Sequence, residues 1–312
     1  MKVYNIQQIY LCILTCEKVL NNLTIYDIIA LKGGETMIEE LSAEELDRIQ
    51  EQRERKIYKA DVMVNARYSL SVPEQRLILY AISMIQKNDT ADTWYTIDLS
   101  DFCKVCGAVG DSYTKAKRLL QGLRDKSWFA KITPDDPNEE TTLSWFDKVK
   151  ITKGRSVRIR FDDDIFPYVK DLLERYQDTG QGYTSYVLQS VLPMQSKYGI
   201  RLYELLKSKI KTSHHFNWYF LLDDLKKMLE CENYKRYPDF RRYVIEPAIT
   251  EINKYSDINV NFYTVEKRNI SKLYFDIDRK SDSELMKAHQ DSLTELEGNI
   301  HYWDFFKSGD EP

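Results

Sequence analysis

The chain has 312 residues, which is enough for about two domains of ordinary size. Hydrophobic residues make up 43% of it and charged residues 30%, with 8 prolines and 11 glycines, which excludes a collagen-like, low-complexity or largely disordered protein. The formal net charge of −4 argues at first against a nucleic-acid-binding protein, but residues 60–280 carry 35 Lys or Arg against 31 Asp or Glu, so the acidic excess lies at the two ends.

No segment has the character of a membrane anchor or an export signal. The most apolar run, Ile9 to Thr15, is much shorter than the roughly 20 residues that cross a bilayer, and no convincing cleavage site follows it. The cysteine count is odd, which fits reduced thiols in a cytoplasm. We therefore expect a cytoplasmic protein without a membrane partner. The five cysteines are Cys12, Cys16, Cys103, Cys106 and Cys231.

The N-terminal region divides into two parts. Lys32 to Glu35 reads Lys-Gly-Gly-Glu, as a purine-rich ribosome-binding site does when it is translated in frame, and Met37 follows two codons later. Synthesis would then start at Met37, and residues 1–36 would be upstream sequence; the alternative is an ordinary Gly-Gly turn. Residues 37–59 are charged and helix-favouring, with capping-box spacing at Ser42 and Glu45, and predict a solvated N-terminal helix or arm.

The first half of the body predicts one compact unit of helices and strands. Pro73 begins a helix that extends to Ile85, with proline in the first turn where a missing N–H costs little. The alternation of apolar and polar residues after Leu143 is typical of half-buried antiparallel strands. In chain order, the unit continues with a strand (94–99), a helix from Ser100, a break at Gly107 and Gly110, a second helix (112–126), and two strands (143–152 and 156–161) around a basic turn.

The second half repeats this order about 120 residues later, with a strand (216–221), a short helix (223–229), a polar break (231–237), a second helix (239–255), and two strands (258–262 and 273–277) around a basic turn. Strand, helix, turn, helix and hairpin in this order describe a winged helix. The sequence therefore predicts an α+β fold with two tandem winged-helix domains, and the first of them is expected to serve both dimerisation and DNA binding. The expected parts of the body are domain 1 (60–182), a connecting helix (183–211) that Pro193 kinks or divides, domain 2 (212–280) and an acidic C-terminal tail (281–312).

Basic residues cluster where a winged helix contacts DNA. The second helix of such a unit enters the major groove with its N-terminal residues near the base edges. In the second unit, an apolar stripe recurring every four residues is expected to face inward, and it leaves arginines on the open side of the helix. For each cation taken singly, the alternative is that it lies on a solvated helix face without any DNA contact. The stripe is Phe240, Val244, Ala248 and Ile252. The candidate DNA-binding residues are Lys115, Lys117, Arg118, Lys153, Arg155, Lys235, Arg236, Tyr237, Arg241, Arg242, Lys254, Lys267 and Arg268.

Signals for catalysis are weak. The lone Cys-x-x-Cys motif at Cys103 and Cys106 has no second pair to complete a zinc site, so it predicts core thiols. His214 and His215 are adjacent and point to different sides of an extended chain, whereas rolling-circle nicking enzymes space their metal-binding histidines by one residue. Asp162 to Asp164 lies where carboxylates cap a following helix, and the chain has no phosphate-binding P-loop. We expect no catalytic residue, metal or cofactor, and no enzyme activity.

Three segments are similar to one known family: Val62–Ile78, Tyr198–Lys207 and Tyr237–Lys254. The last contains a proline–alanine pair (Pro247 and Ala248) before a Glu-Ile-Asn triplet, and resembles the recognition-helix signature of the replication initiator proteins of theta-type plasmids. The resemblance spans about residues 60–280 and leaves both termini unexplained.

The resemblance implies a plasmid-associated bacterial protein that binds directly repeated origin DNA, the iterons, to start replication. As a dimer through its first unit, it would bind an inverted repeat, repress its own gene and so limit plasmid copy number. The host initiator, helicase loader and helicase would be its partners. The acidic loop at 134–140 departs from the family's first wing. The alternatives are a winged-helix transcriptional regulator without initiator activity and a rolling-circle nickase.

The helix from Pro73 to Ile85 is more apolar than a single buried stripe requires. We therefore expect it to expose apolar surface in the monomer and to repack in a dimer interface. Protein concentration would then select between direct and inverted repeats.

Overall fold

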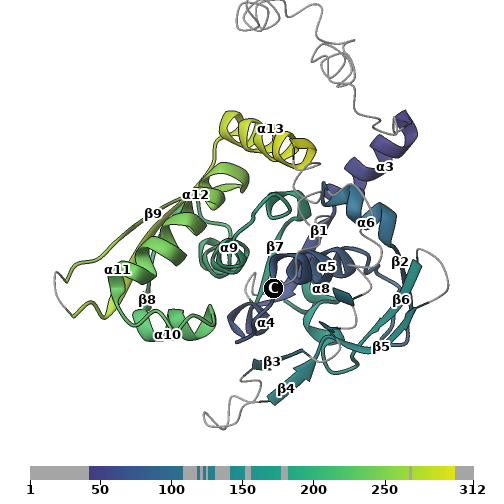
Figure 1. Ribbon diagram of the computed structural model, residues 1–312, viewed down its shortest axis with the longest axis horizontal. Helices are drawn as coiled ribbons and strands as arrows, with labels where there is room; N and C mark the ends of the chain where they lie inside the picture. Colours follow the sequence, from purple (N-terminus) through teal and green to yellow (C-terminus); the bar gives the residue numbers. More distant parts are fainter. Residues whose placement is uncertain are drawn as a thin grey trace, which may run out of the picture. The chain divides into compact units, whose positions relative to one another are not determined.

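The computed structural model describes residues 42–107, 118–119, 122–123, 126–130, 141–151, 156–176, 182–266 and 269–298 (Figure 1). Glu44–Pro312 forms one compact unit, and the architecture below belongs to it. Residues 1–36, Met37 and the acidic loop at 134–140 lie outside the described residues, so the expectations on them stay predictions.

The first half contains an N-terminal helix, a group of small sheets and a long central helix. Its elements are α3 (Ala43–Arg53), β1 (Lys56–Ala60), α4 (Asp61–Asn65), α5 (Val72–Ser83), β2 (Tyr95–Asp98), α6 (Leu99–Val105), β3 (Ser127–Ala130), β4 (Thr141–Ser144), β5 (Phe146–Ile151), β6 (Ser156–Phe161), the 3₁₀ turn η1 (Phe166–Tyr168), α8 (Leu172–Arg175), β7 (Tyr183–Val187), the 3₁₀ turn η2 (Leu188–Ser190) and α9 (Lys197–Ile210).

The second half is simpler, with one sheet, a long helical segment made of several parts and a C-terminal helix. Its elements are β8 (His215–Leu221), α10 (Leu222–Met228), α11 (Tyr237–Phe240), the π-helical segment η3 (Arg241–Ile245), α12 (Glu246–Tyr255), β9 (Ile258–Tyr263), β10 (Lys272–Arg279) and α13 (Asp282–Gly298).

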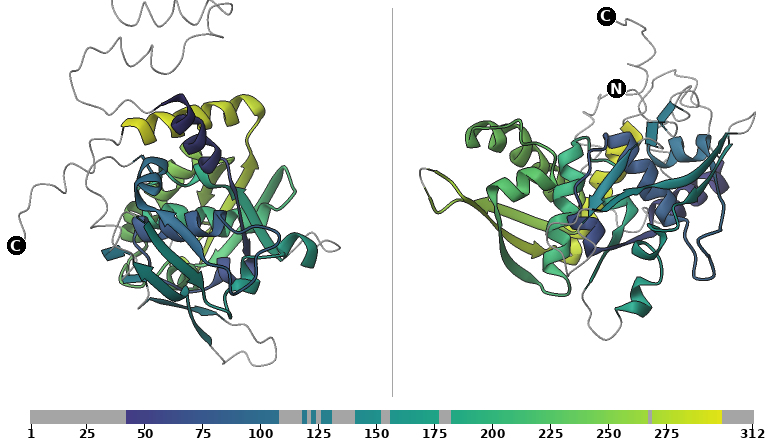
Figure 2. Two further views of the ribbon diagram at one scale, coloured as in Figure 1. Left: turned by 90° about the vertical axis from the view of Figure 1, so that its right-hand side faces the viewer. Right: turned by 90° about the horizontal axis from the view of Figure 1, so that it is seen from below.

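The two halves contain the same three-stranded antiparallel sheet, which supports the internal repeat. The strand order is β2-β6-β5 in the first half and β8-β10-β9 in the second, so the first strand of each unit pairs with the last, and the last pairs with the middle one. Figure 1 places these two sheets on opposite sides of α9, and Figure 2 shows the same residues from two further directions. The duplicated order of strand, helix and hairpin agrees with two winged-helix units.

Alternating burial gives each sheet an inner and an outer face. Val157 and Ile159 on β6 are fully buried, and so are Phe275 and Ile277 on β10, while the residues between them are half-buried or exposed. The helices cover the inner face, since α6 contacts β2 and α12 contacts β9. Half-buried strands were predicted at these positions and are confirmed.

Helix α5 begins as its sequence predicts but is buried on more sides than expected. Pro73 lies in the first turn, and the N–H of Ser71 donates to the Glu74 carboxylate at 2.7 Å, as in a capping box. Leu79 and Tyr80, on different sides of the helix, are 2% and 4% exposed. The expectation of an apolar face free for a dimer is therefore wrong, because α5 already packs inside its own domain.

The segment 183–211 differs from the helix predicted for most of it. Residues 183–187 form strand β7, paired with β1 so that Tyr186 lies opposite Ile57, and the helix starts only at Lys197. The partner strand is more than a hundred residues away, a long-range pairing that helix periodicity does not detect. Once α9 begins, it is buried almost throughout, as a packing helix should be.

The N-terminal helix α3 also packs more closely than the solvated arm that was expected. The Arg53 guanidinium donates to the carbonyl oxygens of Lys104 and Val105 at 3.1 and 2.9 Å, which satisfies two carbonyls at the end of α6. Ile49 is buried as well, at 4% exposure. The acidic and basic residues of α3 therefore surround a contact surface that anchors the helix.

The acidic C-terminal region forms helix α13, which touches both halves. It packs on α12 and on η2. Its backbone at Leu296 lies so close to Gly107 that a Cβ there would fall 2.1 Å from the Leu296 carbonyl oxygen, and Gly107 has φ +70°. Glycine at the predicted break is thus required for both reasons. In the part of the chain described, no helix is long and apolar enough to cross a membrane.

Candidate nucleic-acid interface

The second unit contains a continuous helical segment, from Tyr237 to Tyr255, through α11, η3 and α12. We call this segment the reading helix, because the sequence predicts that it contacts the DNA bases. The predicted inward stripe is confirmed, since all four of its residues are 0% exposed: Phe240, Val244, Ala248 and Ile252. The side opposite the stripe is open.

Two arginines occupy the N-terminal half of this open side. Arg241 and Arg242 are both exposed, but their surroundings differ. The Nε of Arg241 lies 2.7 Å from the Glu246 carboxylate. Arg242 lies over the ring of Tyr243 at 5.4 Å and forms no ion pair with any residue that the structure describes. Arg242 is therefore the cation on this helix whose charge is least compensated.

Tyr243 is a surface residue that sequence reasoning missed. Its side chain is 53% exposed and its ring stacks on Tyr234 at 6.2 Å between centroids. An exposed tyrosine hydroxyl can donate a hydrogen bond, which is the chemistry of a phosphate contact. The sequence could have identified Tyr243 as exposed, because it directly precedes Val244 of the buried stripe and neighbouring residues in a helix point in different directions.

The other second-unit candidates are distributed along the same helix and the turn before it. Lys235 is exposed, and Arg236 is paired with Asp239 at 2.8 Å. Tyr237 is half-buried, and burial raises the pKa of its hydroxyl. Lys254 lies at the far end, where it pairs with Glu295 of α13 at 3.4 Å. The structure thus brings Lys235, Arg236, Tyr237, Arg241 and Arg242 to the N-terminal side, and holds Lys254 against α13.

In the first unit, the structure describes only part of the predicted contact surface. Arg118 lies in a helical turn and is exposed. Lys150 and Arg158 were not among the predicted contact residues, yet both are exposed on the hairpin strands β5 and β6. They lie at 4.3 and 5.1 Å from the ring of Trp94. Alternation along β5 and β6 could have identified them. The candidates outside the described residues are Lys115, Lys117, Lys153, Arg155, Lys267 and Arg268.

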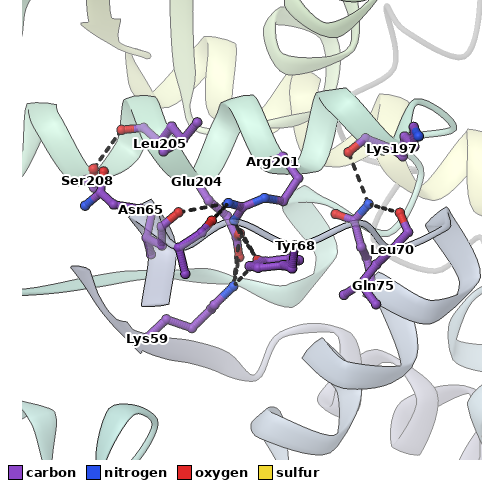
Figure 3. A network of polar contacts seen from close by, with 12 residues as sticks. Lys59, Asn65, Tyr68, Leu70, Gln75, Lys197, Arg201, Glu204, Leu205 and Ser208 are labelled. Carbon is purple, nitrogen blue, oxygen red and sulfur yellow. Dashed lines mark hydrogen bonds and ion pairs between the residues drawn. The ribbon is translucent and has the colours of Figure 1, made fainter. Parts of the chain in front are cut away.

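A buried ionic cluster fixes α9 beneath the first unit (Figure 3). Glu204, 1% exposed, accepts from Lys59 at 2.8 and 3.0 Å and from Arg201 at 3.0 Å. Tyr186 donates to the same carboxylate at 2.5 Å, and Tyr68 donates at 3.4 Å. Burial alone would raise the pKa of Glu204, but the two cations outweigh it and hold the pKa below its usual value.

A second carboxylate joins the reading helix to α9. Glu251 of α12 accepts the backbone N–H groups of Gln195 and Ser196, at 3.0 and 3.1 Å, just before the first turn of α9. Gly199 permits this approach, because a Cβ there would lie 2.6 Å from the Glu251 carboxylate. The orientation of the reading helix is therefore coupled to the helix that leaves the first unit.

Gly199→Ala should push the Glu251 carboxylate away from the N–H groups of Gln195 and Ser196. We expect a cost of about 1–3 kcal/mol, the usual cost of inserting a methyl group where there is no room, reduced by the roughly 0.5–1 kcal/mol that alanine gains over glycine in a helix. Gly122→Ala is the matched control, since its Cβ would come no closer than 3.9 Å to a neighbour and alanine favours a helix by about 0.5–1 kcal/mol. Urea unfolding of the two variants measures both effects. Equal stability of the two variants would contradict the close approach at Gly199.

The cysteine pair and the histidine pair that were weighed as metal ligands both lie in the described part of the chain. Cys103 and Cys106 are buried thiols, as predicted, and burial raises the pKa of Cys106 to about 12. His215 lies 2.6 Å from Asp278 at the exposed start of β8. Over the described ranges, no group of three His, Cys, Asp or Glu side chains is arranged to hold a metal ion.

Two family comparisons match this architecture. Residues 56–207 match the family described as "Initiator Replication protein, WH1", and residues 221–277 match "Initiator Rep protein, WH2". The chain belongs to the initiator replication protein family. It is a plasmid replication initiator with two winged-helix, DNA-binding domains, so the predicted α+β fold and the predicted role in plasmid replication initiation are confirmed.

Relatives from Escherichia coli agree with this assignment. A "Replication initiation protein" is 23% identical over 261 residues, which cover 78% of this chain and 73% of the relative. A "PI protein" is 30% identical over 132 residues, which cover 38% of this chain and 42% of that protein. The WH2 match includes the whole helix 237–255 and all four residues of its buried stripe.

Proposed function

We propose that this initiator binds directly repeated origin DNA and that the helix 237–255 inserts into the major groove to read it. The observation that carries the proposal is the division of this helix into a fully buried stripe and an open side with Arg242 near the N-terminal end. A winged helix reads bases from that end, and an arginine can bind guanine with two parallel hydrogen bonds. Arg242 would therefore read a base edge.

The remaining cations would hold the DNA backbone. Lysine and tyrosine hydroxyls mostly contact phosphate, which positions a protein without reading sequence. In this proposal, Lys235 and Tyr237 contact phosphate before the reading helix. The other phosphate contacts would come from Arg118 and from the candidates at 115, 117, 153, 155, 267 and 268. These cations lie in both proposed domains, domain 1 at 60–182 and domain 2 at 212–280.

The assembly state would select the task. Monomers would bind the direct repeats and start replication, together with the host initiator, helicase loader and helicase. Dimers formed through the first unit would bind an inverted repeat and repress the initiator's own gene. Since α5 is packed inside the domain, such a dimer would use another surface of the first unit. The proposed mechanism consists of binding and assembly, with no covalent step and no cofactor.

Binding to the repeat should weaken steeply with salt. Each neutralised phosphate contributes about 0.9 to the slope of log K against log salt, and the candidate cations predict a slope of at least about −4. Gel shifts between low and physiological salt measure it, with an unrelated duplex of equal length as the control. A flat response would exclude phosphate contacts as the source of affinity.

A further inference from the structure

The outer face of the first-unit sheet is basic. Thr96, Arg158 and Lys150 lie side by side across β2, β6 and β5 and all three are exposed. The ring of Trp94 lies beneath the charged ends of Lys150 and Arg158. We call the surface formed by Trp94, Thr96, Lys150 and Arg158 the first face.

The equivalent face in the second unit is aromatic and acidic. Tyr219, Tyr274 and Tyr263 form a row across β8, β10 and β9, with centroid distances of 5.5 and 5.3 Å. Two residues further along β10, Asp276 and then Asp278 lie on the same face. We call the surface formed by these three tyrosines and two aspartates the second face.

The two faces have opposite charge at their centres. Among the described residues, neither Lys150 nor Arg158 has a carboxylate partner, and Asp276 has no cation. Each face also carries a charge of the other sign, Asp98 at the end of β2 and Lys272 over the ring of Tyr219 at 4.6 Å. These lie at the ends of the strands, so the central rows remain complementary. On the second face, His215 also lies 2.6 Å from Asp278, so Asp276 is the more open of the two carboxylates.

We propose that the first face of one copy of this protein docks on the second face of the copy bound to the neighbouring repeat. The proposal rests on the proposed function, since it assumes binding to tandem repeats. A contact between two different faces repeats head to tail and leaves every copy in the same orientation, which is the arrangement that direct repeats impose. The two sheets lie on opposite sides of α9, so one copy can present both faces at once (Figure 1).

The chemistry of the second face favours a protein partner over nucleic acid. Tyr219 and Tyr263 are 45% and 44% exposed, and tyrosine is enriched in protein interfaces. Asp276 and Asp278 would repel a phosphate backbone but attract Lys150 and Arg158, whose cations can also stack on the tyrosine rings. The first face alone could bind DNA, so the experiment has to separate the two partners.

The test compares one repeat with two adjacent repeats for the full-length protein. We expect wild type to bind two repeats cooperatively, by about 5- to 150-fold, the usual range of coupling between two sites. Lys150→Glu with Arg158→Glu should abolish this factor, and so should Asp276→Lys with Asp278→Lys. Combining all four substitutions restores opposite charges and should recover most of it. Taking the ratio of two-repeat to single-repeat affinity removes any general change in DNA attraction.

Each other outcome overturns the inference in a recognisable way. A loss of single-repeat affinity in the first-face variant, with its cooperativity ratio intact, would assign that face to DNA. Cooperativity that survives either double substitution, is absent in wild type, or is not recovered in the fourfold variant would exclude this pairing of faces. Absence of repeat-specific binding by wild type would refute the proposed function as well, whereas single-repeat binding without cooperativity would refute this inference alone.

Discussion

Glu204→Gln should lower the free energy of unfolding by about 3–5 kcal/mol, the usual cost of removing one partner from a buried ion pair. The substitution removes the negative charge and leaves Lys59 and Arg201 buried beside a neutral amide, and both are almost inaccessible to water. Urea unfolding followed by circular dichroism measures the loss. Glu174→Gln is the control, since the exposed pair of Glu174 with Lys87 at 3.0 Å should contribute little.

The same variant carries a pH signature. The pKa of Glu204 in the folded protein lies below its ordinary value of 4.5. The carboxylate therefore contributes stability above that pH and loses the contribution as the pH falls through the lowered pKa. The gap between wild type and Glu204→Gln should be widest near neutral pH and should narrow in acid. A gap that is small at neutral pH, or constant with pH, would mean that the cluster is not ionised as described.

Arg242→Ala should weaken binding to the cognate repeat by about 1–3 kcal/mol and relax discrimination at one base position. The reason is that Arg242 lies on the open side of the reading helix without a carboxylate partner among the described residues. Arg241→Ala should cost less, because Glu246 already compensates that charge at 2.7 Å. Gel shifts on a set of single-base repeat variants give both the affinity and the specificity.

Lys227→Ala provides a control of equal charge change. Lys227 is an exposed lysine on α10 and lies near Asp224 at 3.9 Å. It should leave both affinity and specificity near wild type. If Arg242→Ala behaves like Lys227→Ala, the helix 237–255 is not the element that reads bases.

Local periodicity was enough to predict the elements on which the proposed function depends. The stripe from Phe240 to Ile252 repeats every four residues and is fully buried, and the alternation at Val157 and Ile159 marks β6 correctly. These patterns are visible in a sequence because each element has one buried side. The duplicated strand order then follows from two copies of one local pattern.

The features that were missed depend on contacts between distant residues. Strand β7 exists because β1 pairs with it, and the two are far apart in the chain. A sequence pattern predicts that the charged residues Lys59 and Glu204 lie in solvent. They are 145 positions apart in the chain, yet the fold brings them into one buried pair. The burial of α5 on several sides likewise depends on neighbours from elsewhere in the fold. Periodicity within a segment contains no information about such partners.

The most direct test of the central claim is transformation with a plasmid whose only origin is the DNA that flanks this gene, with the protein supplied in trans. Wild type and Lys227→Ala should yield transformants at similar frequency, while Arg242→Ala should reduce the frequency strongly and omission of the protein should abolish it. Transformants that arise equally well without the protein, or repeat binding by wild type that supports no transformants, would contradict the account; the second result would identify a DNA-binding regulator instead of an initiator.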